Sequence, residues 1–444
     1  MKQRHRYVRL LALIAVLSLV AAACSNDEDP GTGDSGTTDG ASGEVDCATV
    51  EFGCVEVGAD EPITVGTLLV LSGADATLGQ DSLNGVQLAV DHLDGTFDGT
   101  DGTLLDHPVE LTNEDELCSA EGGQSGATAL AADTSIAAVI GTSCSSAALG
   151  VADTILSEKG VLLFSPSNTN PALTGEGTHQ PFYARTAHND RIQGAIVAEY
   201  SLNELGGTTA ATIADESPYT QGLVAAFEQN FEAGEGTISG SEQINSEDTD
   251  FQPVLRSLAE GNPDVLYFPV FVAACTLIIQ QARDIMPDTE LVVSDGCLSS
   301  DTLKNAGDAA EGVKASSPDI SVFQGESFYA DEFIPAYQEA FNSEPLSVFH
   351  AHAFDAAKVL FQAIEEVAIQ NDDGSLTIPR QALRDAVFAT EGYDGVTGTI
   401  TCTELGDCAT DVTIGIFDAP GWPVEGGTDD PAVYSDTKSL DDVL

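Results

Sequence analysis

Two successive runs of alternating strands and helices constrain the fold of this chain more than any other feature. The first run starts with the apolar, β-branched segment 63–71 and with helical spacing of apolar residues over 82–93, and it continues to residue 164. The pattern restarts after Arg185 and continues to residue 293. Strands that alternate with helices in this way form parallel sheets with helices on both faces. The sequence therefore predicts an α/β protein with two doubly wound, parallel-sheet lobes.

The predicted strands are 63–71, 109–113, 136–141, 161–164, 209–214, 237–244, 265–270 and 290–293. The predicted helices are 82–93, 122–133, 147–158, 192–205, 222–232, 252–260, 275–283, 331–341, 354–368 and 379–389. Apolar residues make up 42% of the chain, which is enough for a large core and excludes a disordered acidic protein.

The N-terminal segment predicts export. Basic residues among the first nine precede an apolar stretch, residues 10–22, which has the length of a secretory signal and is short for a membrane-spanning helix. Small residues directly before Cys24 resemble a bacterial lipobox. We expect residues 1–23 to be a lipoprotein signal peptide and Cys24 to carry a lipid that anchors the protein to the extracytoplasmic side of the cell membrane. An ordinary secretory signal that contains a cysteine is the alternative.

Residues 24–46 predict a flexible acidic linker, because they are Gly, Ser, Thr, Asp, Asn and Pro with almost nothing apolar. The chain has 72 acidic and 15 basic residues, a net charge of −57, and removal of residues 1–23 takes four basic residues and gives −61. Since nucleic acids and anionic membrane surfaces are polyanions, this charge argues against both as partners.

The nine cysteines fit one lipid anchor and four disulfides, which persist outside the cytoplasm. Two pairs are close in sequence, and one of them flanks an expected hairpin loop, 404–407, between strands 398–402 and 411–417. The other two pairs follow strands of one lobe each, at the carboxyl edge of its sheet, where a bridge is sterically reasonable. The expected pairs are Cys47–Cys54, Cys118–Cys144, Cys275–Cys297 and Cys402–Cys408. Free buried thiols are the alternative.

The loops after the strands are the candidate binding loops, because ligands of open α/β sheets bind outside the carboxyl ends of the strands. In the first lobe, Ser145 and Thr169 offer hydroxyls, and the helix expected after Ser145 offers free N–H groups to an anion such as a carboxylate. In the second lobe, Asp295 could accept from a ligand ammonium, and Tyr219 and Phe271 lie in corresponding loops. A helix cap at Ser145 and turn residues at Thr169 and Asp295 are the alternatives.

The layout resembles the leucine/isoleucine/valine-binding protein family, the type I periplasmic binding proteins of branched-chain amino acid ABC transporters. The resemblance covers roughly residues 62–420 and rests on the order and spacing of its motifs. These motifs are 63–66, 71–73, Gly79-Gln80, 84–86, Cys118, Cys144-Ser145-Ser146, Pro166-Ser167-Asn168-Thr169, 171–174, Tyr219-Thr220-Gln221-Gly222, Thr249-Asp250-Phe251 and Gly395-Val396-Thr397-Gly398.

The resemblance implies a binding site for an amino acid. The implied residues are Ser145 and Thr169 at the α-carboxylate, the Ser167 carbonyl and the Asp295 side chain at the α-ammonium, and Tyr219 and Phe271 as the cover from the second lobe. A family member has Glu at the position of Asp295 and aromatic residues at those of Leu78 and Phe271, Tyr in the latter case. The ligand therefore stays open, since family members also bind amides, urea-like molecules and aromatic acids.

The resemblance also implies a three-segment hinge between the lobes, with crossings near 183–187, 311–315 and 395–398. The expected boundaries are 62–184 plus 315–396 for the first lobe, 185–314 plus 397–425 for the second, and 426–444 for an acidic C-terminal tail. Two rigid lobes on such a hinge close when a ligand bridges them.

The predicted function is that of an extracytoplasmic substrate-binding lipoprotein of an ABC importer, a monomer that binds a branched-chain or other small amino acid, or an amide, and delivers it to permease subunits. A lipoprotein that senses the ligand and reports to a membrane receptor is the second hypothesis. An enzyme is disfavoured, because Ser145 stands where a G-x-S-x-G elbow needs its last Gly. His350 and His352 lack an HExxH context, so we expect no metal site and no cofactor.

Overall fold

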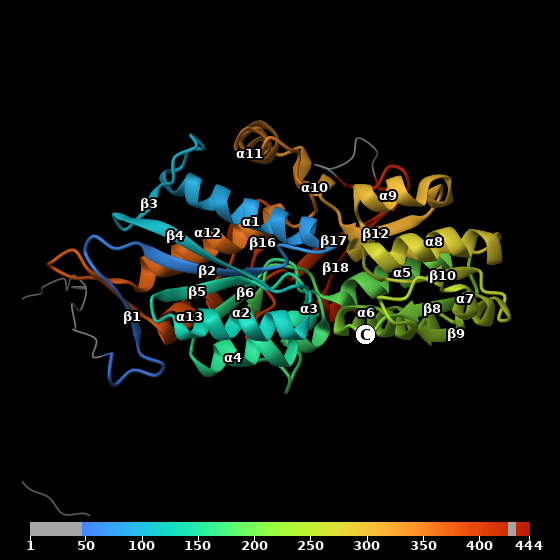
Figure 1. Ribbon diagram of the computed structural model, residues 1–444, viewed down its shortest axis with the longest axis horizontal. Helices are drawn as coiled ribbons and strands as arrows, with labels where there is room; N and C mark the ends of the chain where they lie inside the picture. The colour runs from blue at the N-terminus through green and yellow to red at the C-terminus, as the bar shows by residue number, and fades with distance from the viewer. Residues whose placement is uncertain (1–46, 425–431) are drawn as a thin grey trace, which may run out of the picture. The chain divides into compact units, whose positions relative to one another are not determined.

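The structure, a computed structural model, describes residues 47–424 and 432–444 and builds them around two large sheets (Figure 1). The predicted signal peptide, Cys24 and the linker lie outside the described residues. In the described part of the chain no helix is both long and apolar enough to cross a membrane.

The first sheet has six strands, of which only β3 and β4 pair in the antiparallel direction. Their order is β3 (Thr103–Leu104), β4 (His107–Asp115), β2 (Ile63–Leu69), β5 (Ile136–Gly141), β6 (Leu162–Ser165) and β7 (Tyr183–Arg185). All seven residues of β2 are buried, as expected for a central strand covered on both faces. One face packs on α1 (Ala76–Asp91) and α12 (His350–Val367), the other on α2 (Ala120–Ala132) and α4 (Asp153–Glu158).

The second sheet has seven strands, with five parallel strands extended by two antiparallel ones. Their order is β18 (Tyr434–Ser439), β17 (Asp411–Asp418), β12 (Lys314–Pro318), β11 (Glu290–Val293), β10 (Val265–Tyr267), β8 (Thr209–Ala214) and β9 (Thr237–Gln243). The helices on its two faces are α5 (Asp190–Asn203) and α6 (Pro218–Ala233), and α7 (Gln252–Ala259), α8 (Val272–Ile285) and α9 (Ser300–Ala306). The predicted two-lobed α/β fold is confirmed.

The start of α6 illustrates how local sequence sets an element. Pro218 occupies the first helical turn, where its missing N–H costs no hydrogen bond, and the Ser217 side chain before it accepts a hydrogen bond from the backbone N–H of Thr220. This start places Tyr219 at the edge of the sheet where β8 ends.

The predicted hairpin between 398–402 and 411–417 is wrong. A two-stranded hairpin pairs β16 (Gly398–Ile400) with β15 (Tyr393–Gly395) instead, while β17 pairs with β12 and β18. A further small sheet joins β1 (Cys54–Val57), β14 (Leu376–Pro379) and β13 (Ile369–Gln370), so the first described residues pack on the first lobe. The remaining described helices are α3 (Ser145–Ala147), α10 (Ser321–Gln324), α11 (Ile334–Phe341) and α13 (Arg380–Phe388).

Two crossings between the lobes come later in the chain than expected. The first follows β7, as expected, but β12 stays in the second sheet as far as Pro318, and Ile320 is the first residue after it in the core of the first lobe. The turn at 395–398 packs on the first lobe, where the Asp355 carboxylate accepts hydrogen bonds from the backbone of Val396 and Thr397. The chain therefore crosses for the third time only after Cys408, which lies in the first-lobe core.

The C-terminal segment is not a simple tail. Residues 426–431 of the expected tail lie outside the described residues, but β18 pairs with β17 along its full length and extends the second sheet. The alternation of β18 between half-buried and exposed residues is typical of an edge strand. The acidic composition of this segment led to the prediction of a tail instead.

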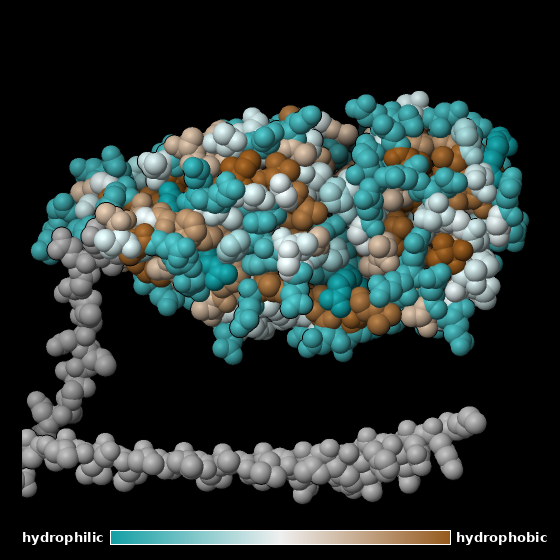
Figure 2. All heavy atoms as spheres, turned by 90° about the horizontal axis from the view of Figure 1, so that it is seen from below, coloured by the Kyte–Doolittle hydropathy of each residue, from teal (hydrophilic) through white to brown (hydrophobic). Residues whose placement is uncertain are grey.

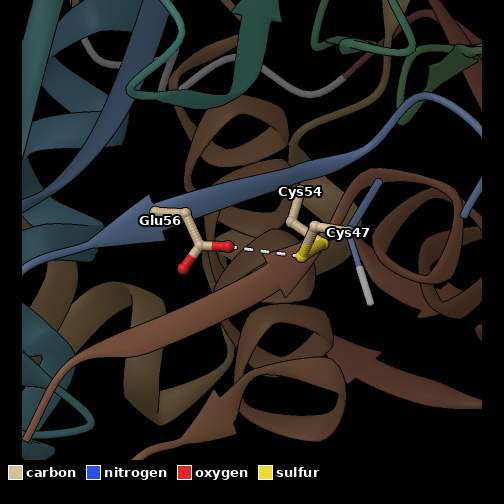
Figure 3. Close-up of side chains that lie close together, drawn as sticks. All are labelled: Cys47, Cys54 and Glu56. Carbon is tan, nitrogen blue, oxygen red and sulfur yellow. Dashed lines mark hydrogen bonds between the residues drawn. A yellow bond between two sulfur atoms is a disulfide. The ribbon is translucent and has the colours of Figure 1, made fainter. Parts of the chain in front are cut away.

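The structure contains the four disulfides that the sequence predicts: Cys47–Cys54, Cys118–Cys144, Cys275–Cys297 and Cys402–Cys408. Figure 3 shows the first of them beside Glu56, whose Oε1 lies 3.2 Å from the Cys47 sulfur. That sulfur is in a disulfide and has no proton to donate, so the contact is a packing contact. Hydrophilic residues cover most of the face that Figure 2 shows, with smaller hydrophobic areas between them, as the acid-rich composition leads one to expect.

Candidate binding site

A cavity between the two lobes collects most of the candidate residues. The space that the centre of a water-sized sphere can occupy in it is about 30 Å³, so the lobes are nearly closed on the cavity, and a ligand enters only when they open. Five of the six predicted ligand-binding residues line it, and they come from loops that follow strands of both sheets. These residues are Ser145, Ser167, Tyr219, Phe271 and Asp295.

Ser145 lies at the start of α3, but the helix predicted over 147–158 is wrong in its first half. The helical geometry breaks at Leu149 and Gly150 within the segment η2 (Ala148–Ala152), before α4 begins. A single turn has little macrodipole, so the expected helix dipole contributes little here. The Ser145 hydroxyl instead accepts a hydrogen bond from the backbone N–H of Asn170 at 3.3 Å, which joins the loop after β5 to the loop after β6.

Thr169 is the predicted residue that does not line the cavity. Its Oγ1 is buried and has no hydrogen-bond partner among the described residues, while its carbonyl accepts from the Asp190 N–H at 3.0 Å. Ser167, two residues earlier, lines the cavity, and its hydroxyl donates to the carbonyl of Ser143 at 3.2 Å. The loop after β6 therefore has one hydroxyl that lines the cavity and one that is buried against the Asp190 carboxyl.

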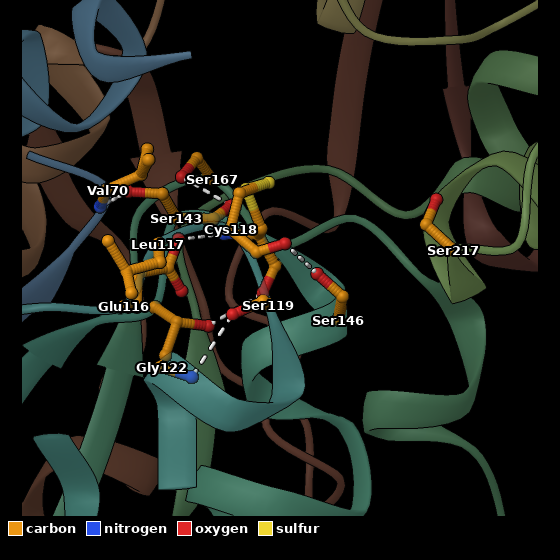
Figure 4. The surroundings of a disulfide bond; sticks show 12 residues. Val70, Glu116, Leu117, Cys118, Ser119, Gly122, Ser143, Ser146, Ser167 and Ser217 are labelled. Atoms are coloured by element: carbon orange, nitrogen blue, oxygen red, sulfur yellow. Dashed lines mark hydrogen bonds between the residues drawn. A yellow bond between two sulfur atoms is a disulfide. The ribbon is translucent and has the colours of Figure 1, made fainter. Parts of the chain in front are cut away.

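Glu116 contacts the loop after β5, next to Ser143 (Figure 4). Its carboxylate accepts a hydrogen bond from the backbone N–H of Cys144 at 3.0 Å, next to the Cys118–Cys144 disulfide. Burial raises the pKa of Glu116 well above its ordinary value. The Glu116 carboxyl thus holds the loop whose residues Ser143 and Ser145 line the cavity.

Asp295 supplies a carboxyl from the second lobe. It is half-buried, and its Oδ1 accepts from the Gln193 side chain at 2.8 Å and from the Tyr219 hydroxyl at 3.3 Å. Burial raises the pKa of Asp295, against the opposite effect of the nearby His188. Within the described residues no ion pair involves Asp295.

Asp190 is a second carboxyl in this region, and reasoning from the sequence missed it. It is fully buried, its side chain faces the Thr169 hydroxyl, and neither group makes a hydrogen bond of good geometry with the described residues. Burial and then the charge of Asp295 raise the pKa of Asp190 well above its ordinary value. From the sequence, Asp190 is indistinguishable from any acid in the first turn of a helix, after the cap residue Asn189. Two coupled carboxyls that form no ion pair in the described residues are what a ligand ammonium would stabilise.

The walls of the cavity are largely apolar. Leu78 and Phe349 line it from the first lobe and Phe271 and Leu298 from the second. The ring of Phe271 lies 5.2 Å from that of Tyr219, centroid to centroid. Phe349 and Leu298 gave no signal in the sequence, because an apolar residue in a loop looks like any other core residue.

The two lobes touch beside the cavity. The Asn170 side chain of the first lobe donates to the Pro218 carbonyl of the second at 2.6 Å, and α3 contacts α6. The structure therefore represents a conformation in which the lobes are in contact.

His350 and His352 do not form a metal site with each other. His350 contacts the Tyr329 hydroxyl at 2.7 Å and the Asp81 carboxylate at 3.1 Å, and burial lowers the pKa of His352 to about 3. Two groups of His, Cys, Asp and Glu side chains in the described residues are compact enough for an ion, one around Cys47 and one around Cys118. Both contain disulfide sulfurs, which are not thiolates.

Comparison with known proteins places this geometry among solute-binding proteins. The model of a family described as periplasmic binding protein matches residues 62–413. A Leu/Ile/Val-binding protein of Rhizobium johnstonii is 27% identical over 349 residues, which cover 79% of this chain and 89% of that protein.

Two solved structures share the fold. One is the branched-chain amino acid transporter substrate-binding protein of Streptococcus pneumoniae in complex with isoleucine. Its TM-score is 0.69 at 24% identity, and the aligned region covers 85% of this chain and 100% of that chain. The other is a solute-binding protein of an ABC transporter from R. palustris in complex with benzoate. Its TM-score is 0.69 at 21% identity, and the aligned region covers 84% of this chain and 97% of that chain.

Proposed function

The chain belongs to the periplasmic binding protein family, whose pattern spans residues 62–413, and from this premise we propose that it is the substrate-binding lipoprotein of an ABC importer. As a member of this family the protein binds a solute and is not an enzyme. In our proposal it captures a small amino acid in the cavity between the lobes, closes on it, and presents it to permease subunits on the extracytoplasmic side of the membrane.

The pair Asp295 and Asp190 is the observation that carries the choice of an amino acid. Both carboxyls have raised pKa values, and neither forms an ion pair in the described part of the chain, although the charges of Arg185 and His188 act on Asp190 and Asp295, respectively. An α-ammonium placed against Asp295 would supply the missing positive charge and would favour ionisation of both groups. The carbonyl of Ser167 is a further acceptor in the same lining in this proposal.

The α-carboxylate of the ligand would face the first lobe. Ser145 lines the cavity there, and the Oγ1 of Thr169 lies one residue from Asn170, whose N–H donates to Ser145. Hydrogen bonds from hydroxyl and backbone N–H donors to a carboxylate are charge-assisted and therefore stronger than those between neutral groups. Tyr219 and Phe271 would cover the ligand from the second lobe.

The solved structures with isoleucine and with benzoate bind ligands of different charge. Benzoate is an anion without an ammonium, and the two carboxyls that line this cavity, Asp75 and Asp295, repel it where they are ionised. This electrostatic argument favours the amino acid over the aromatic acid for this chain. An amide remains compatible with the hydrogen-bond donors and acceptors of the cavity.

The position at the membrane rests on the sequence before residue 47. Small residues before Cys24 support a lipid anchor there, followed by the linker 24–46 as a tether. A lipoprotein that senses the ligand and reports to a receptor would need the same fold and site. Neighbouring permease and ATPase genes would support transport, and a neighbouring histidine kinase gene would support sensing.

Isothermal titration calorimetry against a panel of amino acids, amides and aromatic acids tests the proposal. We expect one-to-one binding of at least one amino acid, with no turnover. Heat with a neutral amide but with no zwitterion would overturn the carboxylate–ammonium site.

A further inference from the structure

Asp75 is a carboxyl of the cavity that the proposed amino acid site leaves unused. It lies in the loop after β2, directly before α1, and lines the cavity from the first lobe. Residues 72–74 before it are exposed, whereas Asp75 is half-buried, and its Oδ1 is buried without a hydrogen-bond partner among the described residues. Its side chain does not cap α1, so the helix does not explain its orientation.

The groups that face Asp75 come from the second lobe. Asp215 follows β8, and the backbone N–H of Val272 opens α8. Burial and the charge of Asp215 raise the pKa of Asp75 to about 6, while a hydrogen bond from the backbone N–H of Val272 to the Asp75 carboxyl lowers it. Contact between the lobes thus places a carboxyl of one lobe near a carboxyl of the other, without a cation between them.

The rest of the lining adds no positive charge. Among the described residues that line the cavity there is no Lys, Arg or His, and Asp75, Asp295 and Tyr219 are its titratable groups. The electrostatic neighbour of Asp75 is Asp215, whereas that of Asp295 is His188, so the two lining carboxyls have separate surroundings. The walls Leu78, Phe271, Leu298 and Phe349 of the same cavity are apolar.

We propose that the ligand is an amino acid with a second cationic group at the end of an aliphatic side chain, and that Asp75 binds this group. The substrate class is then the diamino and guanidino amino acids, such as lysine, ornithine and arginine. This inference rests on the proposed function, because it assumes that an α-ammonium already occupies the site at Asp295.

The chemistry of the cavity fits such a side chain in two ways. Methylene groups can pack on the apolar walls, while a terminal ammonium or guanidinium pairs with Asp75. The terminal cation of the ligand would also be attracted by Asp215 of the opposite lobe. The repulsion between Asp75 and Asp215 would thus be replaced by the attraction of both carboxylates to the ligand. Leucine fills the walls equally well but leaves Asp75 unpaired.

Calorimetry with L-lysine and L-norleucine at pH 7.5 tests the proposal, because the two differ by the terminal ammonium and share the linear chain. We expect lysine to bind about tenfold or more tightly than norleucine, as for an ion pair formed in a partly desolvated site. In Asp75→Asn the ratio of the two affinities should fall to near one. Asp60→Asn is the control, since it makes the same change of charge at an exposed residue in the turn before β2, and it should keep the ratio of the unmodified protein.

Three results would overturn the inference. Norleucine or leucine binding as well as lysine to the unmodified protein would overturn the inference and leave the amino acid site intact. A preference for lysine that persists in Asp75→Asn would also overturn it, because another group would then read the cation. Binding of no amino acid at all would remove the proposed function and this inference with it. Circular dichroism and the melting temperature of each variant show that it is folded.

Discussion

The completely buried guanidinium of Arg185 forms an ion pair with the Asp407 carboxylate, with Nε and Oδ1 2.6 Å apart. Arg185 ends β7 at the first crossing between the lobes, and Asp407 lies in the loop closed by the Cys402–Cys408 disulfide, just before the third crossing. Arg185 also donates to the carbonyls of Asn168 and Asn170 at 3.1 and 3.0 Å. One buried ion pair therefore joins two crossings to the loop that carries Thr169.

Removal of one partner of this pair should destabilise the protein strongly. Asp407→Asn leaves the Arg185 charge buried and unpaired, and such changes cost about 3–5 kcal/mol of unfolding free energy. Chemical denaturation measures this loss, and calorimetry should show weaker ligand binding, because the loop around Thr169 loses its anchor.

Glu404→Gln is the matched control, because Glu404 is exposed in the same disulfide loop. Its unfolding free energy should stay within about 0.5 kcal/mol of that of the unmodified protein. Similar losses in both variants would mean that the loop as a whole, and not the ion pair, is responsible.

Glu116 should act as a neutral hydrogen-bond acceptor, since burial raises its pKa well above the ordinary value. Glu116→Gln keeps a neutral oxygen at the Cys144 N–H, so ligand affinity and melting temperature should change little. Glu116→Ala leaves that N–H buried without its acceptor, at a cost of about 1–3 kcal/mol, and should weaken binding through the displaced Ser143 and Ser145. If the Gln variant were as impaired as the Ala variant, an ionised carboxylate would be needed instead.

The apolar periodicity was sufficient to predict the two lobes, because a buried parallel strand such as β5 is a short, continuous apolar run between helical segments. Where pairing depends on distant partners, the sequence was not sufficient. β16 is three residues long, and nothing local decides between β15 and β17 as its neighbour. β18 is an acidic edge strand and resembles a tail.

For the candidate site, loops after strands could be predicted because topology brings the carboxyl ends of parallel strands together. Side-chain environment could not be predicted in the same way. Asp190 and Asp75 resemble ordinary acids near a helix start, and only the tertiary packing shows that each has an unpaired oxygen beside another carboxyl. The break at Gly150 likewise lies inside a segment with good helical spacing.

Asp295 and Asp215 give a test of the amino acid site. Asp215 is buried and accepts hydrogen bonds from the Ser217 N–H and the Thr220 hydroxyl, which is a local structural role. Asp295→Ala should therefore weaken binding of a neutral amino acid such as leucine or norleucine by more than Asp215→Ala does, whereas Asp215→Ala should lower the melting temperature more. Equal affinities of the two variants in calorimetry would mean that Asp295 is a turn residue only.

Protonation of buried carboxyls should stabilise the protein as the pH falls from about 7 to about 4, while buried histidines with lowered pKa, such as His188 and His352, oppose this effect below their ordinary pKa of 6.5. Burial raises the pKa of Asp75 and of Asp355 to about 6 from an ordinary value of 3.8, and it also raises the pKa of Asp190 and Glu116. A carboxyl whose pKa is raised by folding contributes stability below its ordinary pKa and loses it as the pH rises through the folded value. For the fully buried Asp355 the loss is about 3 kcal/mol between pH 4 and pH 7.

Melting temperatures measured across this pH range in about 1 M salt separate the buried groups from the net surface charge, because salt screens exposed charges and not buried ones. Comparison of the unmodified protein with Asp355→Asn isolates one carboxyl from the opposing histidines. The variant loses hydrogen bonds to Val396 and Thr397 and melts lower at every pH. The gap in melting temperature between the two proteins should widen as the pH falls from about 7 to about 4, because only the unmodified protein gains a proton at residue 355. A gap that stays constant over this range would show that Asp355 is ionised in the folded protein.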